Sequence, residues 1–167
     1  MFAAGVLIYY KDKSTGEISF LLGNDFRNVL SDFGGKEDPE DNKEPRVTAS
    51  RECYEETMGL LFSFDQIHNL VFKSSFVIGT SYMKKKYYMY LLRLDSKIDT
   101  DILDEKINIL KGFHLEDHLS EKNRIQWVSS KYILENKNKD IRKVFYETFS
   151  MNYRYIIEII ERQKNNT

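Results

Sequence analysis

Residues 34–60 read GGKEDPEDNKEPRVTASRECYEETMGL: two adjacent glycines, a short acidic loop, and then a segment with the pattern of a helix. Ala49, Cys53 and Leu60 are apolar at roughly helical spacing, and Gly59 is placed to end the helix. Two glycines in succession let the backbone turn tightly and offer bare carbonyl or amide groups to an ion or a phosphate. We therefore expect a loop and helix that hold a charged ligand.

Three glutamates gather on one face of this predicted helix. At about 100° per residue, Glu52, Glu55 and Glu56 fall within an arc of roughly 100°. Carboxylates this close repel one another unless a cation lies among them, and Arg51 neutralises only part of their charge. Oxygen ligands grouped in this way suit Mg²⁺ or Mn²⁺. The alternative is an acidic helix face exposed to solvent, and the neighbouring glycines favour the metal site.

The combined pattern G-G-K-x14-R-E-x-x-E-E-x-x-G-L resembles the Nudix box of the Nudix hydrolases, G-x5-E-x7-R-E-U-x-E-E-x-G-U, where U is apolar. The R-E-x-x-E-E core matches residue for residue. Fifteen residues lie between Gly35 and Arg51 where the pattern has thirteen, and Thr57 and Met58 precede Gly59 where the pattern has one residue. Both departures lie outside the carboxylate cluster.

The longer loop leaves the first acidic position of the box open. Counting forward from Gly35 places Asp41 there, whereas counting back from Arg51 places Lys43 there. Glu40, Asp41 or Glu44 would serve as the acid.

The resemblance implies a role for each residue of the box. Glu52, Glu55 and Glu56, with the Gly35 carbonyl, would hold Mg²⁺ or Mn²⁺, and Arg51 would orient a carboxylate. Either Glu55 or a distal acid would take the proton from water. The candidates for that acid are Glu121 first, Glu116 second, and Asp104 or Glu105.

Two groups of lysines are candidates for binding phosphate. Lys36 directly follows the glycines, and its alternative is a surface lysine on a polar loop. Lys84 and Lys86 belong to a run of three lysines bordered by tyrosines, which would hold phosphates while a ring stacks on a base. The alternative for this run is a solvated strand end.

Apolar segments separated by turn residues predict the remaining elements. Residues 2–10 form the continuous apolar run of a central strand, and a turn leads to a second strand over 18–22. Residues 86–94 are the clearest later strand, and residues 124–130 resemble the closing strand of the Nudix fold. Further expectations are strand-like segments over 60–64 and 67–78, a short helix over 101–110, and one long helix or two between about 139 and 163.

An apolar strand, a hairpin and a strand ending in Gly-Gly are also how the Nudix fold opens, so the resemblance covers residues 2–60, with weaker matches beyond. It implies an α/β fold, an α/β/α sandwich with a mixed sheet and C-terminal helices. Residues 1–167 are expected to form a single Nudix hydrolase domain.

Composition narrows the classes of partner. A formal net charge of −1 provides no overall field to recruit nucleic acid or membrane. The single cysteine, Cys53, excludes an internal disulfide and occupies an apolar helix position, so we expect a buried thiol. With no leader-like segment and no apolar run of membrane length, the chain is expected to be cytoplasmic. Monomer and homodimer both stay open.

The resemblance implies a metal-dependent pyrophosphohydrolase that cleaves a nucleoside diphosphate linked to another moiety. Free nucleotides, dinucleoside polyphosphates, nucleotide sugars and the mRNA cap all stay open as substrates. The case for capped RNA as a substrate rests on the lysine run, because the net charge of the chain does not favour binding of RNA. The rival interpretation is a catalytically silent Nudix module that binds a nucleotide or a partner protein, and the intact R-E-x-x-E-E core argues against it.

Overall fold

The computed structural model describes residues 1–80, 85–113, 122–136 and 140–163. A mixed sheet runs through these parts of the chain in the order β3-β2-β1-β6-β5, with β4 paired to β1 and β7 paired to β2. The strands are β1 (Ala3–Lys11), β2 (Ile18–Asp25), β3 (Leu30–Ser31), β4 (Phe33–Lys36), β5 (Phe76–Thr80), β6 (Lys86–Leu94) and β7 (Lys122–Ser129).

Strand β1 lies at the centre because its side chains are apolar on both faces. It is parallel to β6 and antiparallel to β2 and β4. Val6 and Ile8 pack into one hydrophobic cluster, and Leu7 and Tyr9 pack into a second one on the opposite face. The predicted central strand is thus confirmed, together with the α/β class.

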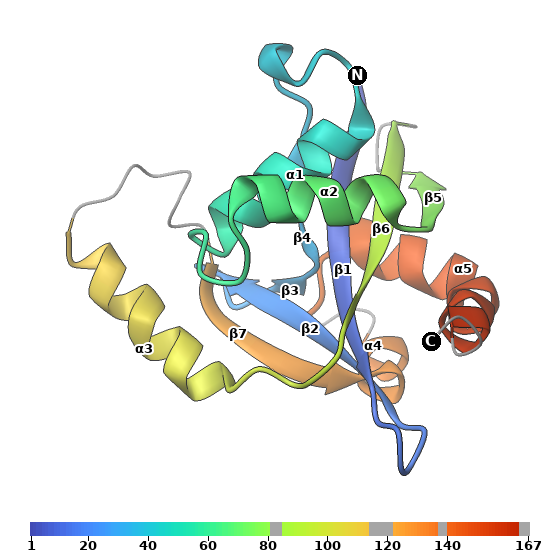
Figure 1. Cartoon of the computed structure of the whole chain (residues 1–167). Helices are drawn as coiled ribbons and strands as arrows, with labels where there is room; N and C mark the ends of the chain where they lie inside the picture. The colour runs from blue at the N-terminus through green and yellow to red at the C-terminus, as the bar shows by residue number, and fades with distance from the viewer. Residues whose placement is uncertain (81–84, 114–121, 137–139, 164–167) are drawn as a thin grey trace.

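Helices cover both faces of the sheet (Figure 1). On one face lie α1 (Pro45–Glu56) and α2 (Phe64–Lys73), and on the other lie α4 (Ser130–Glu135) and α5 (Lys143–Arg162). Helix α3 (Thr100–Lys111) runs alongside β7, and a short 3₁₀ helix, η1 (Pro39–Asp41), precedes α1. Within the described residues, no helix is long and apolar enough to cross a membrane.

The expectation of strands over 60–64 and 67–78 was wrong for most of that range. Residues 64–73 form helix α2, and only Phe76–Thr80 is a strand. Ser63 and Gln66 form a reciprocal capping box that starts the helix. Ile67 and Val71, four residues apart, are its buried side chains. These two signals outweigh the β propensity of the phenylalanines and isoleucines nearby.

Candidate active site

Asp41 is one of the acidic residues considered for the first position of the box, and its side chain is bound to Arg51. Its carboxylate accepts hydrogen bonds from Arg51 Nε at 3.0 Å and Nη2 at 2.9 Å, and from Thr48 Oγ1 at 2.8 Å. Asp41, the residue reached by counting forward from Gly35, is thus bound to the arginine of the box. Asn42 and Lys43 follow in the left-handed backbone conformation, which takes up the extra loop length before α1 begins.

Arg51 connects the loop, β4 and helix α1. Its Nη1 lies 3.0 Å from Glu55 Oε2 and 3.1 Å from Glu52 Oε1, and its Nη2 donates to the Lys36 carbonyl at 3.0 Å. The hydrogen bond to Asp41, with the charges of Glu52 and Glu55, raises the pKa of Arg51 above its usual value. Arg51 is therefore charged at all working pH values and holds two of the three box carboxylates in place.

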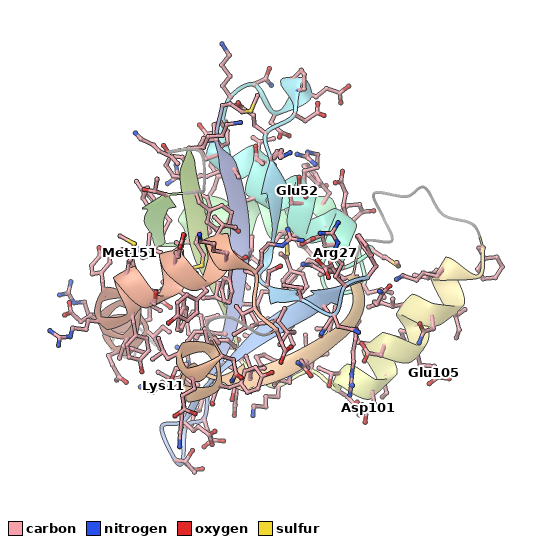
Figure 2. All side chains as sticks on the ribbon, turned by 180° about the vertical axis from the view of Figure 1, so that it is seen from behind. Lys11, Arg27, Glu52, Asp101, Glu105 and Met151 are labelled. Carbon is pink, nitrogen blue, oxygen red and sulfur yellow. The ribbon has the colours of Figure 1, made fainter. Side chains whose placement is uncertain are left out.

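Gly35 provides the space into which the Glu52 side chain fits; Figure 2 labels Glu52 on α1. A Cβ atom on Gly35 would lie 2.4 Å from Glu52 Oε1 and 2.5 Å from Oε2. Real Cβ atoms do not approach this closely, so any other residue at position 35 would displace the carboxylate end of the Glu52 side chain.

Replacing Gly35 with Ala is therefore expected to move the Glu52 carboxylate and to destabilise the protein by about 1 kcal/mol, the lower end of the cost of overpacking, because the end of the Glu52 side chain can shift. Chemical denaturation measures the loss. Gly112→Ala is the matched control, because Gly112 ends α3 with ordinary helical angles and its nearest contact would be 3.2 Å. That control should change stability by less than about 0.5 kcal/mol. Equal stability of both variants would contradict the packing argument.

Glu56 lies at the inner end of the cluster and is 2% exposed. Its Oε2 accepts a hydrogen bond from the Gly34 amide at 2.8 Å, and its Oε1 lies 3.2 Å from Lys122 Nζ. Lys122 is equally buried and also donates to Ser31 Oγ at 2.7 Å. Glu56 thus fastens α1 to β4 and β7 through groups that are far apart in the sequence.

Two buried carboxyls near this point have raised pKa values. Burial raises the pKa of Glu56 to about 8, with the positive charge of Lys122 acting in the opposite direction. Burial likewise raises the pKa of Asp32 to about 6, although a hydrogen bond from the Tyr87 hydroxyl at 2.7 Å lowers it. The site therefore contains groups whose charge changes between pH 5 and pH 8.

Two pockets flank β4. The box pocket has a volume of about 400 Å³ and includes Glu52 in its lining. The apolar pocket has a volume of about 190 Å³ and lies on the side of α5. The box pocket is lined by Gly34, Gly35, Lys36, Glu37, Asp38, Arg51, Glu52 and Arg142. The walls of the apolar pocket include Phe2, Ala3, Tyr87 and Val144.

Solved structures of known proteins share this fold. A Caenorhabditis elegans Ap4A hydrolase matches with a TM-score of 0.56 and 19% identity, over 95% of this chain and 98% of that chain. The NUDIX domain of Shewanella oneidensis NrtR, solved with ADP ribose, matches with a TM-score of 0.50 and 10% identity, over 98% and 88%. The chain has the Nudix fold.

A third similar structure is the C-terminal domain of mouse MUTYH in complex with human PCNA, with a TM-score of 0.54 and 11% identity, over 92% of this chain and 88% of that chain. No protein-family model matches the sequence, and no curated protein matches it. The likeness therefore lies in the fold, and the Nudix fold here brings the box residues into one site.

Not every residue predicted for the site is placed there. Lys84, Glu116 and Glu121 lie outside the described residues. Lys36 is exposed and lines both pockets, whereas Lys86 is exposed at the start of β6 and lines neither of these two pockets.

The two remaining acid candidates lie on α3. Asp104 accepts a hydrogen bond from the Ile125 amide at 2.8 Å and pairs with Arg124, so its carboxylate is used to attach α3 to β7. Glu105 is exposed on α3, away from Glu52 (Figure 2).

Four residues of this region were not expected from the sequence. Lys122 and Arg142 supply buried or half-buried cations, and Asp32 and Tyr87 form a hydrogen-bonded pair in the wall of the apolar pocket. Each comes from a different part of the chain, and each is one polar residue in an ordinary segment. A charged residue at the start of a strand, such as Lys122, gives no local signal that its partner is a glutamate on a distant helix.

Proposed function

We propose that the chain is a single-domain, metal-dependent pyrophosphohydrolase, which cleaves a nucleoside diphosphate linked to another moiety. The observation that carries the proposal is the geometry of the R-E-x-x-E-E core. Arg51 pairs with Glu52 and Glu55 and donates to the Lys36 carbonyl, and an open pocket is lined by Arg51, Glu52 and Gly34–Lys36. The solved structures with this fold include an Ap4A hydrolase and a domain that binds ADP ribose, which supports a nucleotide-type substrate.

The donor set fits Mg²⁺ or Mn²⁺. Within the described residues, no group of three His, Cys, Asp or Glu side chains is already arranged to hold a metal ion. However, three carboxylates are gathered here, and Arg51 and Lys122 each offset part of their charge. Glu52, Glu55 and Glu56, with the Gly35 carbonyl, would hold the metal, which when bound screens substrate charge and lowers the pKa of water.

The residues of the chain would then act as follows. Glu55, held by Arg51, accepts a proton from the attacking water. The water oxygen bonds to phosphorus as the bridging P–O bond breaks. Lys36, exposed at the end of β4, binds a phosphate oxygen. Glu56 keeps the Gly34 amide and the strand end in position. Glu121, which directly precedes β7 in sequence, is the candidate for a second acid.

A substrate panel tests the proposal. The purified chain is incubated with Mg²⁺ or Mn²⁺ and with Ap4A, ADP-ribose, a nucleotide sugar or capped RNA, and the products are separated by chromatography. We expect cleavage of a phosphoanhydride bond in one or more of these compounds, and none in EDTA. Absence of cleavage across the whole panel with either metal would favour the silent, ligand-binding module.

A further inference from the structure

The box pocket and the apolar pocket meet along one short strip of β4. Four residues line both of them: Gly34, Gly35, Lys36 and Arg142. Two are glycines, which leave the backbone bare, and two carry a positive charge. A strip of this kind is suited to a chain of phosphates passing from one pocket to the other.

Arg142 reaches this strip from the far end of the sequence. Its backbone amide donates to the Leu30 carbonyl at 2.8 Å, and its Nη2 donates to Asp25 Oδ2 at 3.3 Å. Among the described residues, the bond to Asp25 is the one hydrogen bond that its guanidinium makes, and the side chain is 36% exposed. Because a guanidinium carries five N–H donors, most of them are directed at the pockets or at solvent.

The charges around Arg142 keep it protonated without covering it. Burial lowers its pKa, but the nearby carboxylates of Glu56, Asp25 and Asp32 raise it further than burial lowers it. The Asp32 side chain accepts from the Tyr87 hydroxyl and is also near Lys122, so part of its charge is already offset. Arg142 therefore stays a fixed cation at the junction of the pockets.

Helix α5 adds to the positive electrostatic potential that Arg142 creates at the junction of the pockets. Arg142 is its N-cap, and Val144 in its first turn lines the apolar pocket. The N-terminal end of a 20-residue helix carries a partial positive charge, which favours an anion nearby. The apolar pocket thus has a positively charged rim and walls that include Phe2, Ala3, Tyr87 and Val144.

We propose that Arg142 binds the phosphate chain of the substrate where that chain crosses β4, so that the diphosphate lies over Gly34–Lys36 and the less polar end enters the apolar pocket. This assignment rests on the proposed function. It makes Arg142 a substrate-binding residue contributed by the last helix, outside the box. The substrate would then extend across both pockets, with its diphosphate at their junction.

Calorimetric binding of ADP and of adenosine tests the assignment, in buffer containing EDTA. We expect Arg142→Gln to weaken ADP binding about tenfold or more and to leave adenosine binding within about twofold, because adenosine carries no phosphate. In the hydrolysis assay the same variant should raise KM more than it lowers kcat. Arg142→Lys, which retains the charge but not the planar fork, should recover part of the ADP affinity.

Two matched variants separate substrate binding from a structural role. Arg27→Gln removes an exposed arginine from the loop after β2, two residues from Asp25, and should leave ADP binding unchanged. Asp25→Asn breaks the ion pair but keeps the guanidinium, so it should weaken ADP binding much less than Arg142→Gln does. Equal losses in Asp25→Asn and Arg142→Gln, or equal ADP affinity in Arg142→Gln and the wild type, would overturn the proposal.

The binding measurement and the hydrolysis assay test the two proposals separately. If the panel shows no cleavage but ADP binding depends on Arg142, the phosphate site stands and the proposed hydrolysis is wrong. If cleavage occurs and Arg142→Gln alters neither KM nor ADP affinity, hydrolysis stands and the assignment of Arg142 is wrong.

Discussion

Glu55→Gln is expected to lower kcat by about 10²–10⁴-fold while leaving the fold intact. Glutamine keeps the size of the side chain but cannot accept the proton of water, and general-base catalysis contributes roughly this factor. The Glu55 carboxylate is 18% exposed and lies 3.0 Å from Arg51, so the substitution changes charge without opening a cavity. The melting temperature in EDTA should be unchanged or slightly higher, because the substitution removes a negative charge close to that of Glu52. Added Mg²⁺ should stabilise the variant less than the wild type.

Glu158→Gln is the matched control for this experiment. Glu158 forms the same kind of ion pair on α5, with Arg162 four residues away, but lies on an exposed face. We expect its kcat and its response to Mg²⁺ to equal those of the wild type. Full activity in Glu55→Gln would exclude Glu55 as the general base and as an essential ligand.

The elements of the fold could be predicted where one type of periodicity dominates. The apolar run of β1, the strand over Lys86–Leu94 and the helix of the box all appear close to their predicted ranges, because each is long and its pattern is unmixed. Helix α2 was missed because its buried side chains, Ile67 and Val71, also have high β propensity. In such a segment the cap at Ser63 is the deciding signal.

The site could be predicted only as far as it is local in sequence. Glu52, Glu55 and Glu56 share one helix, so their proximity follows from helical spacing alone. The partners of Glu56 come from β4 and β7, and Arg142 comes from the start of α5. Their proximity depends on the order of the strands in the sheet. No spacing of residues along the sequence predicts that order. Asp41 is the intermediate case, because only the count from Gly35 indicated this residue, and its hydrogen bond to Arg51 was not predicted.

The metal-free protein is expected to lose stability as the pH rises from 5 to 8, with Glu56 as the main cause. In the folded chain the pKa of Glu56 is raised to about 8, well above the usual value of 4.5. Folding therefore favours the protonated carboxyl, and this contribution is complete below the pKa of the unfolded chain and is lost as the pH rises through the folded value. Asp32, with its pKa raised to about 6, acts in the same direction over the lower half of the range.

Glu56→Gln separates this effect from the rest of the protein. Glutamine resembles the protonated acid, so the variant should match the wild type near pH 5 and should be more stable than it by about 2–4 kcal/mol near pH 8. The measurement is urea denaturation in EDTA at both pH values, with Glu158→Gln as the exposed control whose pH dependence should equal that of the wild type. Carboxylates with lowered pKa values, such as Asp25, change charge below this window and do not affect the comparison. If Glu56→Gln keeps the full pH dependence of the wild type, the Glu56 carboxyl is not the source of that dependence. The positive charge of Lys122 would then keep Glu56 ionised over the whole pH range.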